Sequence, residues 1–218
     1  LTMIGCTVSE NTATRNNGGG IYAGANLTMT GGAVTGNQAQ FNGNGGGIYT
    51  KDKLDMTGVT LTGNKTASGD GGGIYTTGTL TMTDCTLTNN KAGTGGGGIL
   101  TSGTCSLTMK TCILTGNVAN FNGGGGVYAS GSSFTMTDCT LTGNVAKNTG
   151  GGGVYVADGT FTMKGSSRIS LSTGAEENEQ GKNEVFLTNN KMIAVPAALT
   201  GTTPVARITP AAYNKSTQ

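Results

Sequence analysis

The apolar residues of this chain recur at a regular interval of roughly 26–27 residues. Each unit opens with a leucine or phenylalanine, and a methionine follows two places later. The opening residues are Leu1, Leu27, Leu54, Leu80, Leu107, Phe134 and Phe161. The methionines are Met3, Met29, Met56, Met82, Met109, Met136 and Met163. Such repetition predicts a fold in which equivalent units stack on one another.

Every unit contains three short stretches in which apolar and polar residues alternate, separated by glycine, asparagine and threonine. A period of two in stretches this short predicts β-strands rather than helices. Three short strands cannot bury their own inward face, so each unit must pack against its copies. We therefore predict an all-β fold, a single-stranded parallel β-helix (solenoid) of about six to seven coils. Each coil would contain 25–28 residues, and neighbouring coils would lie about 4.8 Å apart.

One asparagine occupies the tenth place after the opening residue of each of the first six units. These residues are Asn11, Asn37, Asn64, Asn90, Asn117 and Asn144. We expect them at a sharp turn, because asparagine tolerates left-handed backbone angles and stacked amides can hydrogen-bond from coil to coil. The glycine runs that follow allow bends that a Cβ atom would obstruct.

One unit carries a recognisable motif, Phe41-Asn42-Gly43-Asn44 followed by Gly45-Gly46-Gly47-Ile48. The other units keep the Gly-Gly-x-[Ile/Val] half and lack the phenylalanine. Residues 1–164 thereby resemble the right-handed parallel β-helix repeats of bacterial surface proteins, in particular the repeats of polymorphic outer-membrane proteins. The resemblance implies a right-handed solenoid in an exported bacterial protein.

The regular pattern predicts three regions along the chain. Residues 1–164 would form the β-helix repeats. Arg168 stands where a leucine is expected, so we interpret residues 165–203 as an irregular last coil and cap. Residues 204–218 would be an exit strand or a linker to a missing C-terminal region. Because the chain begins within a repeat and shows no targeting segment, we interpret it as a fragment of a longer protein.

Composition excludes several classes of function. Charged residues make up 11% of the chain and the net charge is +2, which gives no basis for binding nucleic acid. No apolar run approaches the length of about 18 residues that a membrane-spanning helix needs, so we expect no direct membrane insertion. Histidine is absent and no C-x-x-C pair occurs, so we expect no metal and no cofactor.

The cysteines are interpreted as structural. Cys6, Cys85, Cys112 and Cys139 share one place in the unit with Gly32 and Val59. That equivalence predicts small inward side chains that remain free thiols. Cys105 lies at a different place and could face either way.

Two aspartates share a place two coils apart, Asp84 and Asp138, with Thr111 between them and Lys110 nearby. Two coil steps, about 9.6 Å, lie near the upper end of the carboxylate spacing in inverting glycosidases. We favour turn aspartates that bond their own backbone, and we predict no catalytic residue.

Tyrosines follow the inward Ile or Val of the third stretch, so the alternation points them outward. They are Tyr22, Tyr49, Tyr75, Tyr128 and Tyr155, and Leu100 fills the fourth place. These five are our candidate ligand-binding residues, because a column of rings could stack on the faces of sugars. A self-stacking ladder that stiffens the coil is the alternative.

These patterns favour a non-catalytic structural or adhesive segment, a stalk or adhesin, in a larger exported bacterial surface protein. We expect an extracellular or cell-surface location associated with the outer membrane. Host or environmental glycans or proteins and flanking segments of the same chain would be its partners. A polysaccharide-active enzyme or polysaccharide-binding module is the alternative. Regular Thr-x-Thr columns resemble ice-binding solenoids and give a third hypothesis, although Asp55, Lys110 and Lys164 interrupt them.

Overall fold

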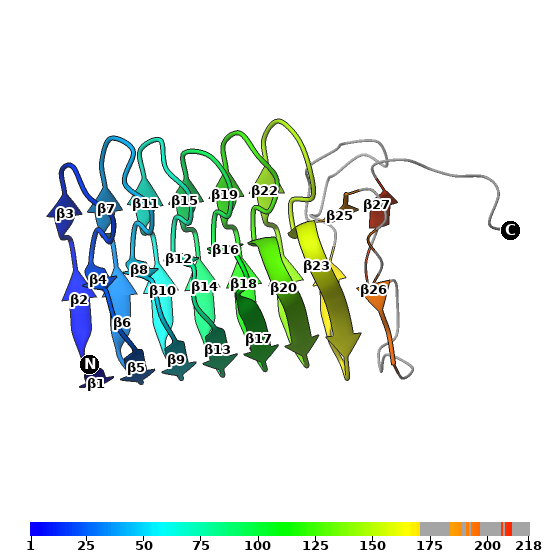
Figure 1. Cartoon of the computed structure of the whole chain (residues 1–218), viewed down its shortest axis with the longest axis horizontal. Helices are drawn as coiled ribbons and strands as arrows, with labels where there is room; N and C mark the ends of the chain where they lie inside the picture. Colours follow the sequence, from blue (N-terminus) through cyan, green and yellow to red (C-terminus); the bar gives the residue numbers. More distant parts are fainter. Residues whose placement is uncertain (171–183, 189–190, 192, 197–205, 207, 211–218) are drawn as a thin grey trace, which may run out of the picture.

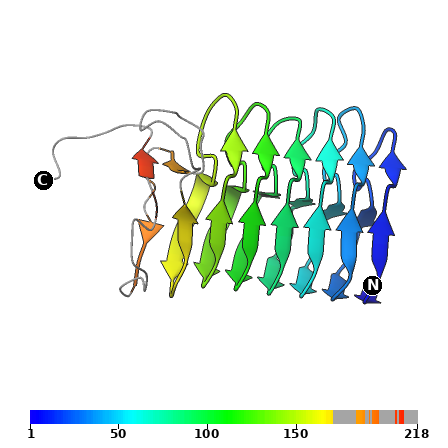
Figure 2. The ribbon, with the colours of Figure 1, turned by 180° about the vertical axis from the view of Figure 1, so that it is seen from behind.

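The computed structural model describes residues 1–170, 184–188, 191, 193–196, 206 and 208–210, and these form a parallel β-solenoid (Figure 1). The coils stack in chain order along the long axis, and the view from behind shows the same succession (Figure 2). All pairings between strands are parallel, and each strand pairs with its equivalents in the neighbouring coils. The predicted all-β solenoid is confirmed.

A coil contains four strands. In the first coil they are β1 (Thr2–Ile4), β2 (Thr7–Ser9), β3 (Thr12–Ala13) and β4 (Ile21–Ala23). The sequence pattern predicted three strands, because the strand after the asparagine at the tenth place of each unit has only two residues and cannot show alternation. Its inward residue is small, usually alanine, and Ala39, Ala92 and Ala119 are completely buried.

The strands equivalent to β1 open each coil. They are β5 (Leu27–Thr30), β9 (Leu54–Thr57), β13 (Leu80–Thr83) and β17 (Ser106–Lys110). The strands equivalent to β4 close each coil. They are β8 (Ile48–Thr50), β12 (Ile74–Thr76) and β16 (Ile99–Ser102). In the next two coils the closing and opening strands merge into β20 (Val127–Thr137) and β23 (Val154–Lys164). Because of this merger, the coil-opening strands and the coil-closing strands belong to one 14-stranded sheet.

Two smaller sheets complete the coil. The seven-stranded sheet contains β2, β6 (Ala33–Thr35), β10 (Thr60–Thr62), β14 (Thr86–Thr88), β18 (Ile113–Thr115), β21 (Thr140–Thr142) and β24 (Arg168–Ser170). The six-stranded sheet contains β3, β7 (Gln38–Ala39), β11 (Lys65–Thr66), β15 (Lys91–Ala92), β19 (Val118–Ala119) and β22 (Val145–Ala146).

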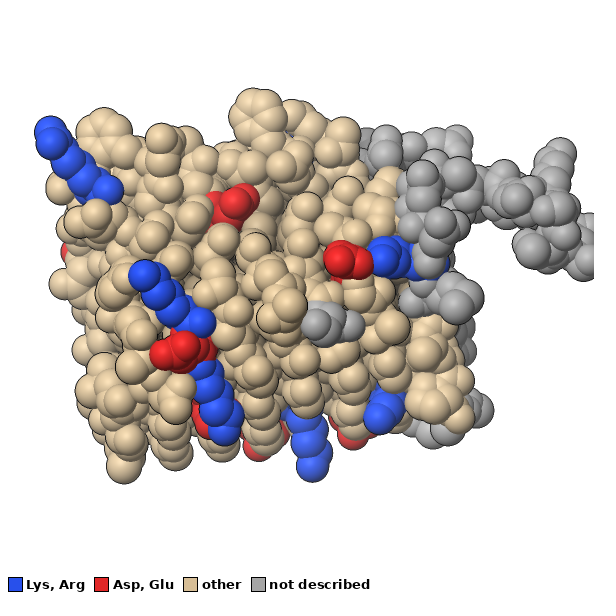
Figure 3. Space-filling model, in the orientation of Figure 1, with Lys and Arg blue, Asp and Glu red and all other residues tan. Residues whose placement is uncertain are grey.

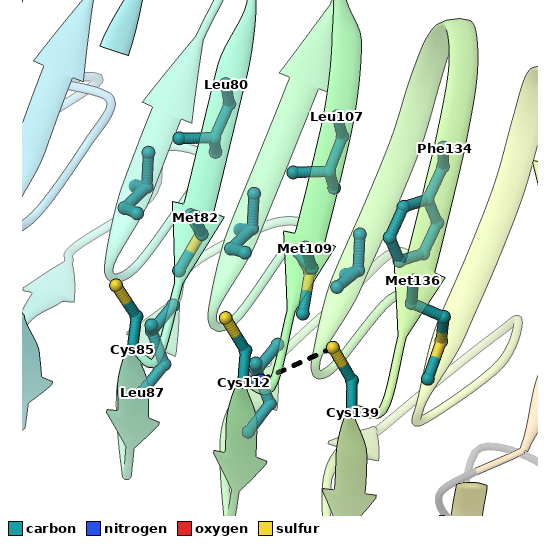
Figure 4. Close-up of a cluster of buried hydrophobic side chains, with 14 of the residues drawn as sticks. Leu80, Met82, Cys85, Leu87, Leu107, Met109, Cys112, Phe134, Met136 and Cys139 are labelled. Atoms are coloured by element: carbon teal, nitrogen blue, oxygen red, sulfur yellow. Dashed lines mark hydrogen bonds between the residues drawn. The ribbon is translucent and has the colours of Figure 1, made fainter. Parts of the chain in front are cut away.

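The interior is filled by equivalent apolar residues of successive coils, stacked in register. Leu54 pairs with Leu80, and Met56 pairs with Met82, at the same level of the bore. Figure 4 shows the leucine, methionine and cysteine side chains of successive coils directed into this space. The buried apolar side chains form one continuous cluster along the solenoid, so each coil supplies the surface that covers the next.

The cysteines Cys85, Cys112 and Cys139 are buried free thiols in this interior, as predicted. The backbone N–H of Cys112 lies 3.4 Å from the sulfur of Cys139 (Figure 4). Cys105 is also buried, with 3% of its surface exposed, but it does not belong to the core cluster that contains the other three. Cys6 is partly exposed.

The inward ladder of the seven-stranded sheet has one more member than the sequence pattern predicted. Strand β24 pairs with β21 so that Ile169 lies against Leu141, and Arg168 lies against Thr140 on the outward side. The expectation that Arg168 interrupts the core was therefore wrong. One extra residue in the preceding turn, next to Ser167, moves the inward isoleucine one place further along the chain than the repeat predicts.

Three more strands lie at the C-terminal end: β25 (Val185–Leu187), β26 (Ile193–Ala194) and β27 (Ile208–Pro210). Strands β25 and β26 both pair in parallel with β23, and β27 pairs with β25. Val185 continues the inward ladder above Val154. Much of the predicted cap (165–203) and exit segment (204–218) lies outside the described residues.

Candidate functional site

Each of the five candidate tyrosines is the second residue of its strand, and the rings form stacks. Strand pairing places Tyr22 beside Tyr49, Tyr49 beside Tyr75, and Tyr128 beside Tyr155. Their ring centroids are 5.2, 5.3 and 4.8 Å apart, respectively. Phe186 extends the second stack, 5.2 Å from Tyr155.

The stacking covers most ring faces. The ring planes of Tyr22, Tyr49 and Tyr75 are within 6° of parallel, so each face of Tyr49 lies against another ring. Tyr22 at the end of the stack is 51% exposed, whereas Tyr49 is 8% exposed. An open platform of five ring faces, as expected for sugar stacking, is therefore not formed. The alternation of the strand correctly placed the rings outside the bore, but it carried no information about ring-on-ring packing.

Glycines in the preceding loops allow the rings to lie close to the backbone. A Cβ atom on Gly123 or Gly150 would overlap Cδ2 of Tyr155. Burial raises the pKa of the Tyr49 hydroxyl, and the neighbouring Tyr75 adds to the effect. The pKa of Tyr128 is also raised, chiefly by burial and then by Tyr155 and Asp70.

Leu100 divides the column into two stacks. It pairs with Tyr75 on one side and with Tyr128 on the other. Beside it lies a cavity of about 190 Å³. The cavity is lined by Asp70, Tyr75, Leu100, Ser102, Asn122, Tyr128 and Ser130.

Asp70 belongs to a short ladder that the sequence analysis missed. Asn17, Asn44 and Asp70 each precede a glycine run, and each side chain accepts a hydrogen bond from the backbone of the next coil. Asn17 Oδ1 accepts from Asn44 N at 2.8 Å, and Asn44 Oδ1 accepts from Asp70 N at 2.8 Å. Asp70 Oδ1 accepts from Gly95 N at 2.9 Å. The three residues occupy equivalent positions when the repeat units are aligned on their glycine runs. When the units are aligned on their methionines, the loop of variable length shifts the three residues out of register.

The ladder ends where the tyrosine column is interrupted. Gly95 occupies the next position and has no side chain to continue it, and Gly123 and Gly150 follow. Burial raises the pKa of Asp70, while the hydrogen bond from Gly95 opposes the shift. A half-buried carboxylate therefore lies at the edge of the cavity.

The predicted asparagine stack is present and buried from Asn37 to Asn144. Asn37 N and Nδ2 both donate to Asn64 Oδ1 at 3.0 Å, and Asn64 N and Nδ2 repeat this toward Asn90. Each Nδ2 also donates to a carbonyl of the preceding coil, as from Asn64 to Val34 at 2.8 Å. Asn11, in the first coil, is exposed and donates to Asn37.

We expected the asparagine to adopt the left-handed backbone conformation in this turn. The residue before it does so instead. Glu10 and Asn89 have φ angles of 55°, and glycine occupies the same place in the other coils. The asparagine is thereby free to direct its amide along the stack.

The paired aspartates are turn residues on the surface. Asp84 and Asp138 have φ angles of 53° and 54°, and glycine takes their place in most coils. Asp138 Oδ1 accepts hydrogen bonds from Ser166 N at 2.8 Å and Ser166 Oγ at 3.0 Å. The expected bond to its own backbone is thus replaced by bonds to the next coil. These bonds lower the pKa of Asp138, with a smaller contribution from Lys110.

Charges are sparse on the face that Figure 3 shows, and acidic and basic side chains are scattered over it. Lys53 pairs with Asp55 at 2.7 Å, and Lys191 pairs with Asp158 at 2.6 Å. Within the described residues, no three His, Cys, Asp or Glu side chains are grouped so as to hold a metal ion. The same residues contain no helix long and apolar enough to cross a membrane.

Comparison with known proteins supports the architecture. Searches for similar curated proteins and for similar solved structures each returned no match. The family model described as a right-handed β-helix region matches residues 2–192, which is most of the chain. With the parallel ladders and inward stacks described above, this match shows that the chain belongs to the right-handed β-helix family.

Proposed function

We propose that this chain is a non-catalytic, rigid spacer within a larger exported bacterial surface protein. The observation that carries the proposal is the buried asparagine stack, which joins every coil from Asn37 to Asn144 to its neighbours. The resemblance of residues 1–164 to surface-protein repeats supports the exported location.

The stack opposes bending because each joint is bonded on several sides. Asn64 donates to Val34 and Asn90 and accepts two bonds from Asn37. A buried amide that loses such partners costs about 1–3 kcal/mol for each group left unpaired. Opening one joint therefore requires breaking several bonds at once, in addition to the strand pairing.

A non-catalytic role is supported by the positions of the carboxylates. Asp84 and Asp138 are exposed turn residues. The cavity beside Leu100 is lined by a single carboxylate, Asp70, whereas most glycosidases place two around the bond that they cleave.

Two experiments test the proposal. An epitope inserted at the exposed Phe121 should be labelled on intact cells that express the whole protein; labelling only after lysis would contradict the surface location. Small-angle scattering of the whole protein should report an elongated particle. Release of reducing sugar from any polysaccharide, lost in an Asp84→Asn, Asp138→Asn double variant, would contradict the non-catalytic role.

A further inference from the structure

The interruption of the tyrosine column leaves two ring faces without a ring against them. One face of Tyr75 is covered by Tyr49, and one face of Tyr128 is covered by Tyr155. The opposite faces are directed toward Leu100, which lies between them in register. Tyr75 and Tyr128 are two coils apart, about 9.6 Å, so one ring-sized layer separates them.

Leu100 takes the place of a ring in that layer. Its side chain is 6% exposed and is shorter than a tyrosine. The cavity of about 190 Å³ lies beside it, between the two aromatic walls. This cavity, the slot, is partly open to solvent. An enclosed cavity of about 150 Å³ binds benzene, so the volume of the slot is comparable to that of one six-membered ring.

The lining is polar where a ring would present its edge. Asp70, Ser102, Asn122 and Ser130 line the cavity together with the two tyrosines and Leu100. Asp70 uses Oδ1 to accept from Gly95, and a carboxylate has about four acceptor positions on its two oxygens. The hydroxyls and the amide can both donate and accept.

This combination suits a pyranose. A pyranose has C–H groups on its faces and hydroxyl groups around its edge, so its faces match the tyrosine walls and its edge matches the polar residues. A plain aromatic ring would leave those polar groups without partners, at a cost in binding free energy. The charged lining residue is Asp70, so a sugar carrying a carboxylate would be repelled.

Loop lengths explain why the slot forms at this coil. Ile74 and Ile99 are closer together in the sequence than any other two successive members of their ladder, whereas Ile99 and Val127 are further apart than any pair before them. The short loop ends at Gly95, where the Asn17–Asn44–Asp70 ladder stops. The longer loop carries Asn122 to the cavity.

We propose that the slot between Tyr75 and Tyr128 binds a single pyranose ring without a carboxylate, as one residue of a polysaccharide. This site is independent of the spacer role.

The test compares the parent with Leu100→Tyr on an array of neutral, amino and uronic oligosaccharides, followed by calorimetric titration of each hit. Leu100→Tyr fills the slot and completes the ring stack, so binding should fall at least tenfold while the melting temperature does not fall. Tyr22→Leu is the matched control, because Tyr22 lies outside the slot; it should bind like the parent.

Asp70→Asn gives a second readout. It should weaken binding of neutral sugars several-fold and reduce the discrimination against uronic oligosaccharides. Undiminished binding by Leu100→Tyr, an array without a hit, or stronger binding of a tyrosine-containing peptide would each overturn the proposal. None of these outcomes affects the elongated shape of the whole protein, which tests the spacer.

Discussion

Asn64 shows how a single side chain holds three coils together. Its Nδ2 donates to Val34 O in the coil before and to Asn90 Oδ1 in the coil after. Its Oδ1 accepts from the backbone and side-chain nitrogens of Asn37. All four residues are completely buried, so water cannot replace a lost partner.

Asn64→Ala should therefore lower the free energy of unfolding by about 2–4 kcal/mol, because it leaves the buried N–H of Asn37 without its acceptor. Urea unfolding followed by circular dichroism measures this change. Asn11→Ala is the control: Asn11 is exposed and lies in the first coil, so its effect should stay below about 1 kcal/mol. Equal losses in the two variants would show that the stack does not carry the stability that we assign to it.

The glycines differ in what an added methyl group would meet. A Cβ atom on Gly46 would overlap both Gly72 O and the carbonyl carbon of Lys65. Both atoms belong to the backbone of the neighbouring coil, which strand pairing holds in place. Gly58, by contrast, has a φ angle of 63° and open space around it.

Gly46→Ala should destabilise the protein by about 3 kcal/mol or prevent folding, because the neighbouring coil must move. Gly58→Ala should cost only about 1–2 kcal/mol, the strain of a left-handed alanine. Thermal unfolding of both variants tests the ranking. A milder effect at Gly46 would mean that the glycine run is required for its backbone angles rather than for the close approach of coils.

At the scale of elements, the sequence pattern predicted the strands that show alternation and missed those that do not. The two-residue strand containing Ala39 is too short to show alternation. One inserted residue placed Arg168 at the position where the repeat predicts an inward residue, so the inward position of Ile169 was not predicted. Alternation also assigned the tyrosines to the outside but could not show that Tyr49 would be buried between two rings. The slot depends on the different lengths of two loops in neighbouring coils. The alternation of apolar and polar residues within a strand gives no information about how such loops pack.

The short ladder of Asn17, Asn44 and Asp70 gives a prediction about pH. Burial raises the pKa of Asp70 in the folded chain, so the folded state holds this proton to higher pH than the unfolded state does. The contribution of Asp70 to stability therefore falls as pH rises through this range. Asp70→Asn should stabilise the protein at pH 7, because an amide oxygen can still accept from Gly95 N, as Asn44 accepts from Asp70 N.

The advantage of Asp70→Asn should disappear below the unfolded pKa of aspartate, about 3.9. Asp138→Asn provides a control of opposite sign, because hydrogen bonds from Ser166 lower the pKa of Asp138. It should lower the melting temperature at pH 7 and have no effect in acid. Melting temperatures between pH 2 and pH 8 test both, and a stabilisation by Asp70→Asn that is constant across this range would contradict the assignment.

At the scale of the whole molecule, the solenoid is a one-dimensional array in which each coil contacts its neighbours. Met29 and Met56 occupy equivalent positions, as do Asn37 and Asn64. Removal of residues 29–55 would join Thr28 to Met56 in register and place Asn11 beside Asn64 and Tyr22 beside Tyr75. Every ladder would be shorter by one member and otherwise intact.

We expect this whole-coil deletion to fold into a solenoid about 4.8 Å shorter, with a lower free energy of unfolding because one interface between coils is lost. Deletion of residues 29–41, about half a coil, should prevent folding, because it places outward residues on the inward ladders. Small-angle scattering and circular dichroism distinguish the two results. The slot at Leu100 lies outside the deleted segment, so the shorter solenoid should bind sugar as the parent does. If the whole-coil deletion also fails to fold, the coils act as one cooperative unit rather than as interchangeable repeats, and the spacer could not vary in length by gain or loss of coils.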